Sequence, residues 1–344
     1  MLLIDALFLN SPGGITLLKY LYKNLEKHEI NCFFLLDKRS ENDLTSWLAY
    51  EKTFIESNLK NRKQFYLLNR NNFSRVLCFC NIPPPVPLSV PVLTFFQNVN
   101  ILQDCSFYPI RSRVLHYLKR KFIFHYRANT NTWIVQTRFM KHLLIKRLGI
   151  SDKYIEVLPF FDMADQEEAI ITVKKPGSFL YPSTGLGHKN HLALLKAWEL
   201  LHQENRDFEL HLTIPTTDLK LTKLIAELKS KGLKIINHGI IEKSELLALY
   251  QATEYVVYPS LNESFGLPLV EAVQQNCKII AADLPYSKET IIPTTKFDPY
   301  QPNSLKNAII EATLQMGNEK KSEIIIENKI DSLIALLNTS VNSC

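Results

Sequence analysis

The chain has 344 residues, of which 46% are hydrophobic and 22% are charged, a balance that excludes a disordered or fibrous protein. Its length favours two domains of about 100–200 residues each. With 40 basic and 34 acidic residues the formal net charge is +6, which is only mildly basic. No run of about 18 apolar residues predicts a membrane-spanning helix.

The cysteines and the first residues indicate a cytoplasmic protein. No cysteine pair has metal-binding spacing, and the scatter does not resemble a disulfide framework. We therefore interpret as reduced thiols Cys32, Cys78, Cys80, Cys105, Cys277 and Cys344. Asp5 interrupts the apolar first ten residues, which lack a basic leader, so they predict a buried strand rather than a signal peptide.

Short apolar runs alternate with segments of helical period along the chain. Strands are expected at 2–9, 31–36, 75–80, 92–96, 133–136, 155–158, 178–181, 209–214, 234–237, 255–258 and 278–281. Helices are expected at 15–26, 111–126, 139–148, 191–203, 218–231, 243–251, 305–316 and near 329–338. Most strand runs are continuously apolar, as in parallel sheets buried on both faces. The order predicts an α/β fold with doubly wound parallel sheets.

About a dozen strands are too many for one sheet of this kind. The polar segment 160–177, which carries charges of both signs, predicts a linker between two Rossmann-like domains. We expect the domains at 1–165 and 166–325, followed by a C-terminal helix within 326–344. Ligands of such sheets bind beyond the carboxyl ends of the strands, so a cleft between the two domains is the expected site.

The most informative segment runs from 255 to 290. An apolar strand ends at Pro259, a polar loop follows, and a helix begins at Leu267 and Pro268, where proline is favoured. The backbone N–H groups at this helix start are expected to bind an anion or a hydroxyl group in the cleft. They belong to Phe265, Gly266 and Leu267.

Two glutamates flank this helix start. Glu263 lies in the loop beside Ser264, and Glu271 is expected in the first helical turn. Each carboxylate can accept hydrogen bonds from a different part of a ligand. The alternative is a solvated loop acid and a first-turn acid that the helix dipole favours.

This segment resembles the retaining glycosyltransferases of family 4, whose two-domain fold is the GT-B type. The shared motif is two glutamates separated by seven residues, with Phe-Gly-Leu-Pro between them, as in 263–271. The resemblance implies that Glu263 is catalytic and meets the donor sugar, and that Glu271 binds the ribose hydroxyls of the donor nucleotide. It also implies that 166–325 binds the nucleotide sugar and that 1–165 lies on the acceptor side.

A second strand–loop–helix segment lies at 179–201. A lysine at a loop-to-helix junction adds a positive charge to the helix N-terminus, which suits a diphosphate. The resemblance assigns this catalytic role to Lys189. Many family members have an arginine near the position of Ser183 or Thr184, which this chain lacks, and we expect His188 to substitute for it in part. A solvated surface lysine and a histidine without a donor contact are the alternatives.

Two loops of the first half resemble the family less closely. Gly13 and Gly14 follow the first strand, where the family has a Gly-Gly loop facing the donor phosphates and the acceptor; an ordinary tight turn is the alternative. Gln97 and Asn98 stand where the family often has His-Asn near the donor sugar. Glutamine can hydrogen-bond a sugar but cannot transfer a proton near neutral pH, so we expect no histidine-dependent mechanism. Alternatively, Gln97 only ends a strand.

Neither a cofactor nor a metal is expected, because no Asp-x-Asp sequence offers ligands for a metal on the diphosphate. The resemblance implies that the acceptor hydroxyl attacks from the face that the nucleotide leaves. Lys189 and helix N–H groups would stabilise the leaving diphosphate electrostatically, and a diphosphate oxygen would help to deprotonate the acceptor.

The segment from Cys105 to Ser151 is basic: it contains ten Arg and Lys residues and no Asp or Glu. Apolar and aromatic residues alternate with the bases at 111–126, which predicts an amphipathic helix on an anionic membrane surface. The expected membrane face includes Lys119, Arg120 and Lys121. A solvated helix face is the alternative. We expect no nucleic-acid partner, because no nucleic-acid-binding module accompanies the charge.

We therefore interpret the chain as a retaining glycosyltransferase, peripheral at the inner face of the cytoplasmic membrane. It would move a sugar from a nucleotide-sugar donor to a glycan or lipid-linked acceptor in bacterial O-antigen or capsule biosynthesis. The alternative is a non-catalytic GT-B-fold protein that binds nucleotide sugars or glycans. The missing arginine and histidine of the family favour that alternative.

Overall fold

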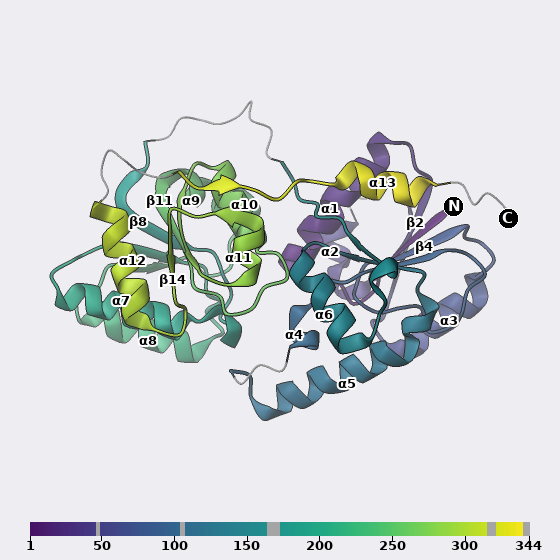
Figure 1. Cartoon of the computed structure of the whole chain (residues 1–344), viewed down its shortest axis with the longest axis horizontal. Coiled ribbons are helices and arrows are strands. Elements are labelled where there is room, and N and C mark those ends of the chain that lie inside the picture. The colour runs from purple at the N-terminus through teal and green to yellow at the C-terminus, as the bar shows by residue number, and fades with distance from the viewer. Residues whose placement is uncertain (46–48, 104–106, 164–172, 315–320, 340–344) are drawn as a thin grey trace. The chain divides into compact units, whose positions relative to one another are not determined.

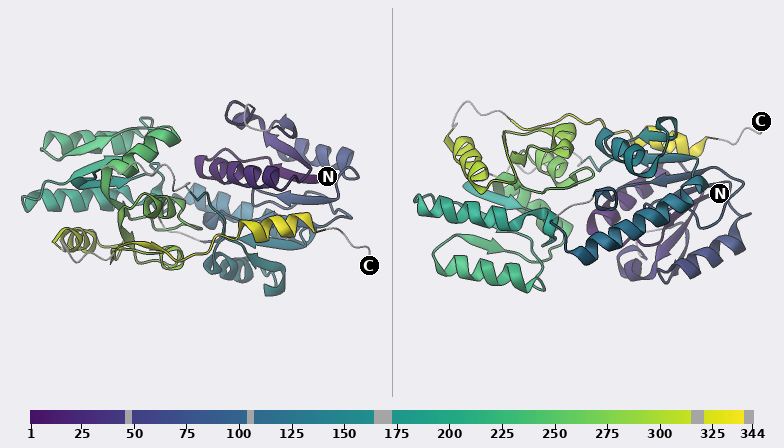
Figure 2. Two further views of the ribbon diagram at one scale, coloured as in Figure 1. Left: turned by 90° about the horizontal axis from the view of Figure 1, so that it is seen from above. Right: turned by 60° about the horizontal axis from the view of Figure 1, so that its bottom comes forward.

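A computed structural model describes residues 1–45, 49–103, 107–163, 173–314 and 321–339. The chain forms two compact units, one of Met1–Asp162 with Glu327–Cys344 and one of Met163–Ile326 (Figure 1). Each unit has its own parallel sheet, with helices on both faces (Figure 2). The predicted fold class, two α/β units with doubly wound parallel sheets, is therefore confirmed.

The first unit contains a seven-stranded parallel sheet of order β3-β2-β1-β4-β5-β6-β7. Its strands are β1 Leu2–Ala6, β2 Cys32–Asp37, β3 Glu51–Ile55, β4 Arg75–Cys78, β5 Val92–Phe95, β6 Thr132–Val135 and β7 Ile155–Val157. Its helices are α1 Pro12–Lys27, α2 Glu41–Leu44, α3 Leu59–Asn69, α4 Val99–Leu102, α5 Ile110–Tyr126, α6 Arg138–Leu148 and α13 Ile330–Asn338. In the fully buried β1, Leu2 and Ile4 pack with α1 and α13, whereas Leu3 packs on the side of α3.

The second unit contains a six-stranded parallel sheet of order β10-β9-β8-β11-β12-β14 and a small antiparallel pair, β13 with β15. Its strands are β8 Lys175–Tyr181, β9 Glu209–Leu212, β10 Ile235–Asn237, β11 Thr253–Tyr258, β12 Lys278–Ala282, β13 Ile291–Ile292, β14 Thr295–Phe297 and β15 Glu323–Ile324. Its helices are α7 His191–Gln203, α8 Leu219–Ser230, α9 Lys243–Ala252, α10 Leu267–Gln274, α11 Pro285–Thr290 and α12 Pro302–Leu314.

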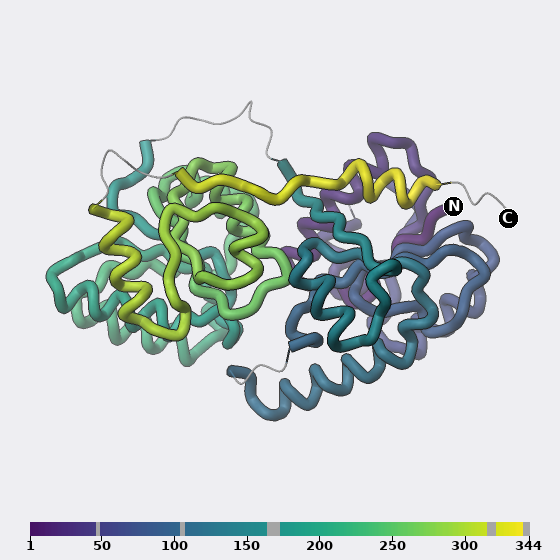
Figure 3. Tube along the Cα trace, in the orientation of Figure 1, coloured from purple at the N-terminus to yellow at the C-terminus, as the bar shows by residue number. Residues whose placement is uncertain are grey.

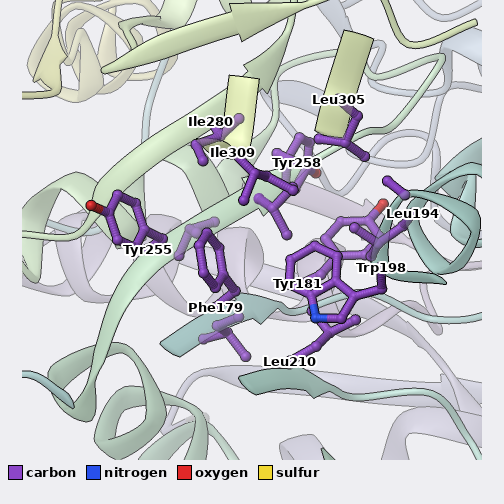
Figure 4. Close-up of a cluster of buried hydrophobic side chains, with 14 of the residues drawn as sticks. Phe179, Tyr181, Leu194, Trp198, Leu210, Tyr255, Tyr258, Ile280, Leu305 and Ile309 are labelled. Atoms are coloured by element: carbon purple, nitrogen blue, oxygen red, sulfur yellow. The ribbon is translucent and has the colours of Figure 1, made fainter. Parts of the chain in front are cut away.

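Aromatic side chains from adjacent strands form the centre of the second core (Figure 4). Phe179 of β8 stacks on Tyr255 of β11 with ring centroids 4.8 Å apart, and it makes edge contacts with Trp198 of α7 at 5.2 Å and with Phe208 at 5.3 Å. This packing fixes β8 against β11, the two strands whose carboxyl ends carry the predicted donor-site loops.

Several elements were not predicted. The strand β3 has the sequence Glu-Lys-Thr-Phe-Ile and none of its residues is buried, so it lacks the apolar run by which the other strands were found. The short elements α2, α4, α11, β13 and β15 are too brief to show a period. The predicted linker overlaps β8 at residues 175–177, and its residues 164–172 lie outside the described residues.

The last helix, α13, completes the first unit rather than the second (Figure 3). Its apolar face is buried, and just before it Asn328 donates hydrogen bonds to the hydroxyl of Tyr20 at 3.1 Å and to the carbonyl of Phe161 at 2.7 Å. Its buried residues are Ile330, Leu333, Ile334 and Leu337.

Among the residues that the structure describes, no helix combines the length and the apolar character needed to cross a membrane. The thiols of Cys32, Cys78, Cys80 and Cys277 are free and buried. Cys105 and Cys344 lie outside the described residues.

Candidate functional site

The two predicted donor-site loops of the second unit lie side by side. Strands β8 and β11 are parallel neighbours, so the loops that follow them leave the same edge of the sheet. The backbone N–H of Leu261 donates to the carbonyl of His188 at 2.7 Å. The backbone of Asn190 is in the left-handed conformation, and its side chain donates to the carbonyl of Pro259 at 3.2 Å. The tertiary structure thus joins loop 182–190 to loop 259–266.

Lys189 and Glu263 form an ion pair at the centre of this site. The ammonium Nζ of Lys189 lies 2.6 Å from Oε1 of Glu263, and the two side chains are only 16% and 15% exposed. The same carboxylate oxygen accepts hydrogen bonds from the hydroxyls of Ser260 at 2.6 Å and Tyr258 at 3.2 Å. Sequence reasoning did not predict this pairing, because the two residues are 74 positions apart.

Two opposing effects set the pKa of Glu263. Burial is the largest single effect and raises the pKa of this carboxyl. The charges of Lys189 and His188 and the hydrogen bonds from Lys189 and Ser260 together outweigh it, so the net pKa lies below the usual value. The carboxylate is therefore ionised at neutral pH and balances the charge of Lys189. The alternative of a solvated loop acid does not describe Glu263, because three donors surround one of its oxygens.

Glu271 lies in the second turn of α10, so the prediction of a first-turn position is wrong. Gly266 caps the helix with φ at +86°, and helix residues begin at Leu267, which makes Glu271 the fifth. The helix-dipole explanation therefore loses its basis, since that effect is confined to the first turn. The hydroxyl of Tyr250 donates to Oε2 of Glu271 at 3.1 Å, a contact that no sequence signal indicated.

The residues between the two glutamates build the helix start. The side chain of Phe265 is buried, and its carbonyl accepts a hydrogen bond from the hydroxyl of Thr290 at 2.9 Å. A Cβ at Gly266 would lie 3.1 Å from Leu269, and its positive φ disfavours any other residue. Ser264 and Leu267 are half-buried beside it. This loop is consequently held in place from the core side.

His188 and the position of the missing arginine lie on the partner loop. His188 is buried, and its carbonyl also accepts from the hydroxyl of Ser260 at 3.3 Å, so its backbone joins the two loops. Ser183 is buried and Thr184 is exposed. Neither can supply the positive charge of the family's arginine.

Gly13 and Gly14, in the first unit, lie inside α1 rather than in a loop before it. The helix begins at Pro12, three residues earlier than predicted, because proline suits the first helical position. A Cβ at Gly14 would lie 2.5 Å from the side chain of Leu9, whereas a Cβ at Gly13 would meet nothing within 4 Å. The tight-turn alternative is therefore wrong, and only Gly14 is required by close packing.

Gln97 and Asn98 follow β5, where Asn81 holds their backbone. The side-chain oxygen of Asn81 accepts from the N–H groups of Gln97 at 2.7 Å and Asn98 at 2.9 Å. Asn98 in turn caps α4 by accepting from the N–H of Asn100 at 3.1 Å. Gln97 donates to the carbonyl of Phe79 at 3.4 Å. The positive φ of Asn81, 67°, is the local feature that builds this turn.

The predicted basic helix is α5, which lies on the outside of the first unit (Figure 2). Ile123 is its one buried residue, and large apolar side chains are exposed, with Ile110 at 75% and Leu118 at 57%. Lys119 and Lys121 are exposed. Arg120 differs, because it is half-buried and its guanidinium lies 3.5 Å from the carbonyl of Ile101.

No group of three or more His, Cys, Asp or Glu side chains is arranged to hold a metal ion within the described ranges.

Comparison with known proteins gives a family match for the second unit. Residues 163–331 match the model of the family described as glycosyl transferases group 1. The O-antigen chain mannosyltransferase RfbU of Salmonella typhimurium is 25% identical over 154 residues, which are 44% of this chain and 42% of that protein. The serotype-specific mannosyltransferase WbdA of Escherichia coli is 28% identical over 136 residues, 38% of this chain and 17% of that protein. The matches thus span less than half of either relative.

Solved structures share the fold over almost the whole chain. A glycosyltransferase from Rickettsia africae has a TM-score of 0.71 and 18% identity, with coverage of 98% of this chain and 92% of that one. Anabaena Alr3699/HepE, solved in complex with UDP and glucose, has a TM-score of 0.67 and 14% identity, with coverage of 97% and 94%. At these identities the likeness concerns the fold, and that fold is the GT-B type.

Proposed function

Because residues 163–331 match the glycosyl transferases group 1 family, we propose that the chain is a retaining glycosyltransferase acting on a nucleotide-sugar donor. The acceptor is a glycan or a lipid-linked glycan of bacterial surface polysaccharide, O-antigen or capsule. The names of the Salmonella and Escherichia coli relatives support this setting. One observation carries the proposal: the ion pair of Lys189 and Glu263, 2.6 Å apart, in the loops that follow two adjacent parallel strands.

Each proposed donor contact follows from the chemistry of one group. Lys189 binds the donor diphosphate together with the N–H groups at the start of α10, from Phe265 to Leu267, and His188 assists. Glu263 accepts hydrogen bonds from hydroxyls of the donor sugar. Glu271 accepts them from the ribose hydroxyls, because a carboxylate can bind two neighbouring hydroxyls.

The proposed reaction needs no nucleophile from the protein. The acceptor oxygen bonds to the anomeric carbon on the face from which the diphosphate departs, and the acceptor proton passes to a diphosphate oxygen. Lys189 stabilises the charge that develops on this leaving group, and Glu263 keeps Lys189 in place before the donor binds. Rate acceleration then comes from positioning and from electrostatics.

The first unit supplies the acceptor side in this proposal. We assign Gly13 and Gly14, of which only Gly13 is exposed, to the donor phosphates and the acceptor, and Gln97 and Asn98 to the transferred sugar. The exposed basic and apolar side chains of α5 bind an anionic bilayer, at the inner face of the cytoplasmic membrane, where a lipid-linked acceptor resides. We propose no nucleic-acid partner.

Neither a metal nor a cofactor takes part in the proposed reaction, since Lys189 and helix N–H groups meet the diphosphate charge. Turnover should therefore persist in excess EDTA. Loss of turnover in EDTA that Mg²⁺ or Mn²⁺ restores would contradict this part of the proposal.

The sugar is tested with nucleotide-linked mannose first, because both named relatives are mannosyltransferases. Nucleotide-linked glucose and galactose serve as comparisons, and release of the nucleoside diphosphate is the readout. An enzyme of this class should slowly hydrolyse its own donor without an acceptor. A protein that binds a nucleotide sugar but never releases the diphosphate, with or without acceptor glycans, would be the non-catalytic alternative.

Binding of the bare nucleoside diphosphate distinguishes the proposed roles of the two glutamates, because this ligand has the ribose but lacks the transferred sugar. Glu271→Ala should bind it about ten- to a hundredfold more weakly, because a hydrogen bond to a charged group is worth roughly 1.5–3 kcal/mol. Glu263→Ala should bind it almost normally but lower kcat, since its contacts change in the transition state. If both variants bind and turn over like the wild type, these roles are wrong.

A further inference from the structure

Tyr250 contacts Glu271 from the core side of α10. Tyr250 lies in the last turn of α9 and is 2% exposed, and its hydroxyl lies 3.1 Å from Oε2 of Glu271. The carbonyl of Pro268 is a second acceptor at 3.4 Å. A hydroxyl has one proton to donate, and the charged, closer carboxylate is the stronger acceptor. The proton therefore points to Glu271.

The backbone of Tyr250 is held as firmly as its ring. Its carbonyl accepts from Nζ of Lys174 at 2.7 Å and from the thiol of Cys277 at 3.1 Å. Lys174 also binds the carbonyl of Thr253 at 2.9 Å, which anchors the end of α9 to the start of β11. With its backbone bound and its ring buried, Tyr250 presents its hydroxyl at a fixed position.

Burial keeps this hydroxyl a donor. It raises the pKa of Tyr250 well above its usual value, and the charge of Glu271 raises it further. The phenol therefore stays protonated at neutral pH. A glutamate on a helix can otherwise adopt several side-chain conformations, and each one that is excluded before binding lowers the entropic cost of binding a ligand.

We propose that Tyr250 is a positioning residue that holds the carboxylate of Glu271 in the orientation that binds the ribose hydroxyls of the donor nucleotide. The inference rests on the proposed function, because it assumes that Glu271 meets the ribose. Tyr250 itself touches no ligand; it acts through Glu271. The competing view is that Glu271 only serves as the hydrogen-bond acceptor that a buried tyrosine hydroxyl generally needs, with no effect on ligand binding.

The test is calorimetric titration of the wild type and its variants with UDP, GDP, CDP and ADP. Tyr250→Phe removes one oxygen and should weaken the best-bound diphosphate about three- to tenfold. Tyr255→Phe is the matched control, because that buried hydroxyl donates to the carbonyl of Ala312 at 3.1 Å and contacts neither glutamate. It should bind the diphosphate like the wild type.

Two further readouts separate positioning from mere packing. In the Glu271→Ala background, Tyr250→Phe should cause no additional loss of affinity, because its partner is gone. The 2′,3′-dideoxy form of the same diphosphate should bind wild type and Tyr250→Phe equally. With donor at saturation kcat should be unchanged, so the effect appears in KM.

The outcomes are distinguishable. If Glu271→Ala weakens the diphosphate and Tyr250→Phe does not, the inference is overturned while the proposed function stands. An equal loss with the dideoxy compound, or an additive loss in the double variant, also overturns it. A wild type that binds none of the four diphosphates overturns both.

If Tyr250→Phe fails to fold, Glu271→Gln takes its place, because it leaves Tyr250 intact and gives its hydroxyl a neutral acceptor. This variant should lower both the melting temperature and the diphosphate affinity. Wild-type values for both quantities would overturn the inference.

Discussion

Lys189 and Glu263 neutralise each other before any donor is present. A diphosphate entering the proposed site competes with one carboxylate oxygen for the ammonium, which has three protons to donate. Glu263 keeps the donors Ser260 and Tyr258 when Lys189 turns to the diphosphate. The site thus binds a charged ligand without leaving a buried charge unpaired.

The first prediction concerns this pair. Lys189→Met leaves a buried carboxylate without its counter-charge, which costs up to about 3–5 kcal/mol of unfolding free energy at neutral pH. In the wild type the folded pKa of Glu263 is lowered, so its stabilisation is present above its usual value of 4.5 and is lost as the pH falls through the lowered pKa. In the variant the lowering effect of Lys189 is gone, while burial, the charge of His188 and the hydrogen bond from Ser260 remain. We therefore expect the pKa of Glu263 to rise and stability to recover as the pH falls.

Urea unfolding between pH 4 and pH 8 measures this change of sign. The control is Lys189→Met with Glu263→Gln, which removes both charges and should restore most of the lost stability near neutral pH. A single variant whose stability follows the pH dependence of the wild type would show that the pair is not electrostatically coupled.

At the scale of elements, two helix starts depend on glycine for different reasons. Gly266 supplies a positive φ before α10, whereas Gly14 lies inside the first turn of α1, packed against Leu9. Gly13, its neighbour, faces open space. The pair Gly13 and Gly14 therefore combines one packing requirement with one position that is sterically free.

The second prediction uses this difference. Gly14→Ala forces the buried Leu9 to move and should destabilise the first unit by about 1–3 kcal/mol. Gly13→Ala should leave stability unchanged or raise it by about 0.5–1 kcal/mol, the helix preference of alanine over glycine. If Gly13 faces the ligand, its variant should lose turnover while staying folded. Thermal unfolding and turnover of both variants measure this, and equal stabilities would contradict the packing argument.

The third prediction concerns α5. Charge reversal of the exposed Arg113, Lys119 and Lys121 to Glu should weaken binding to vesicles of anionic phospholipid roughly a hundredfold or more, at about 1 kcal/mol for each basic residue. Arg120 is left unchanged because it contacts α4. Vesicle co-sedimentation at low salt is the measurement.

The matched control reverses three exposed lysines on α8 in the second unit, Lys220, Lys223 and Lys229. It changes the net charge by the same amount, but α8 exposes one large apolar side chain, Leu219, whereas α5 exposes six. Failure of the wild type to bind anionic vesicles would rule out α5 as the membrane surface. Loss of vesicle binding by the α8 control to the same degree as by the α5 variant would also rule it out.

At the scale of the whole molecule, helix α13 belongs to the same compact unit as β1, although the second unit lies between them in the sequence. The apolar face of α13 packs in the core of the first unit beside α1, and the guanidinium of Arg75 in β4 donates to the carbonyl of Thr339 at 2.7 Å. The stability of the first unit therefore depends on residues 327–339, which follow the whole second unit in the sequence.

The fourth prediction tests this dependence. Leu333→Ala should destabilise the first unit by about 2–5 kcal/mol, the usual cost of removing a buried leucine side chain. Hydrogen exchange should become faster in strands β1–β7 and stay unchanged in β8–β12. The exposed neighbour Ser332→Ala is the control, with a change expected within about 0.5 kcal/mol. Equal acceleration in both sheets would mean that the two units unfold together.

The sequence by itself determined the fold class and the main strands, because buried parallel strands are continuous apolar runs and helices repeat every 3.6 residues. It also identified the segments around Glu263 and Lys189, since local motifs survive in the linear chain. It missed β3, which has no buried residue, and it placed the start of α1 three residues too late.

Only the tertiary structure decided which side chains meet. Lys189 and Glu263 are 74 positions apart, and Tyr250 and Glu271 are 21 apart, yet the parallel pairing of β8 with β11 and the packing of α9 beside α10 bring them into contact. A periodic pattern tells which face of an element is buried, but it does not specify the neighbour. Partners distant in the sequence are fixed by sheet order and register, which arise from the whole core at once.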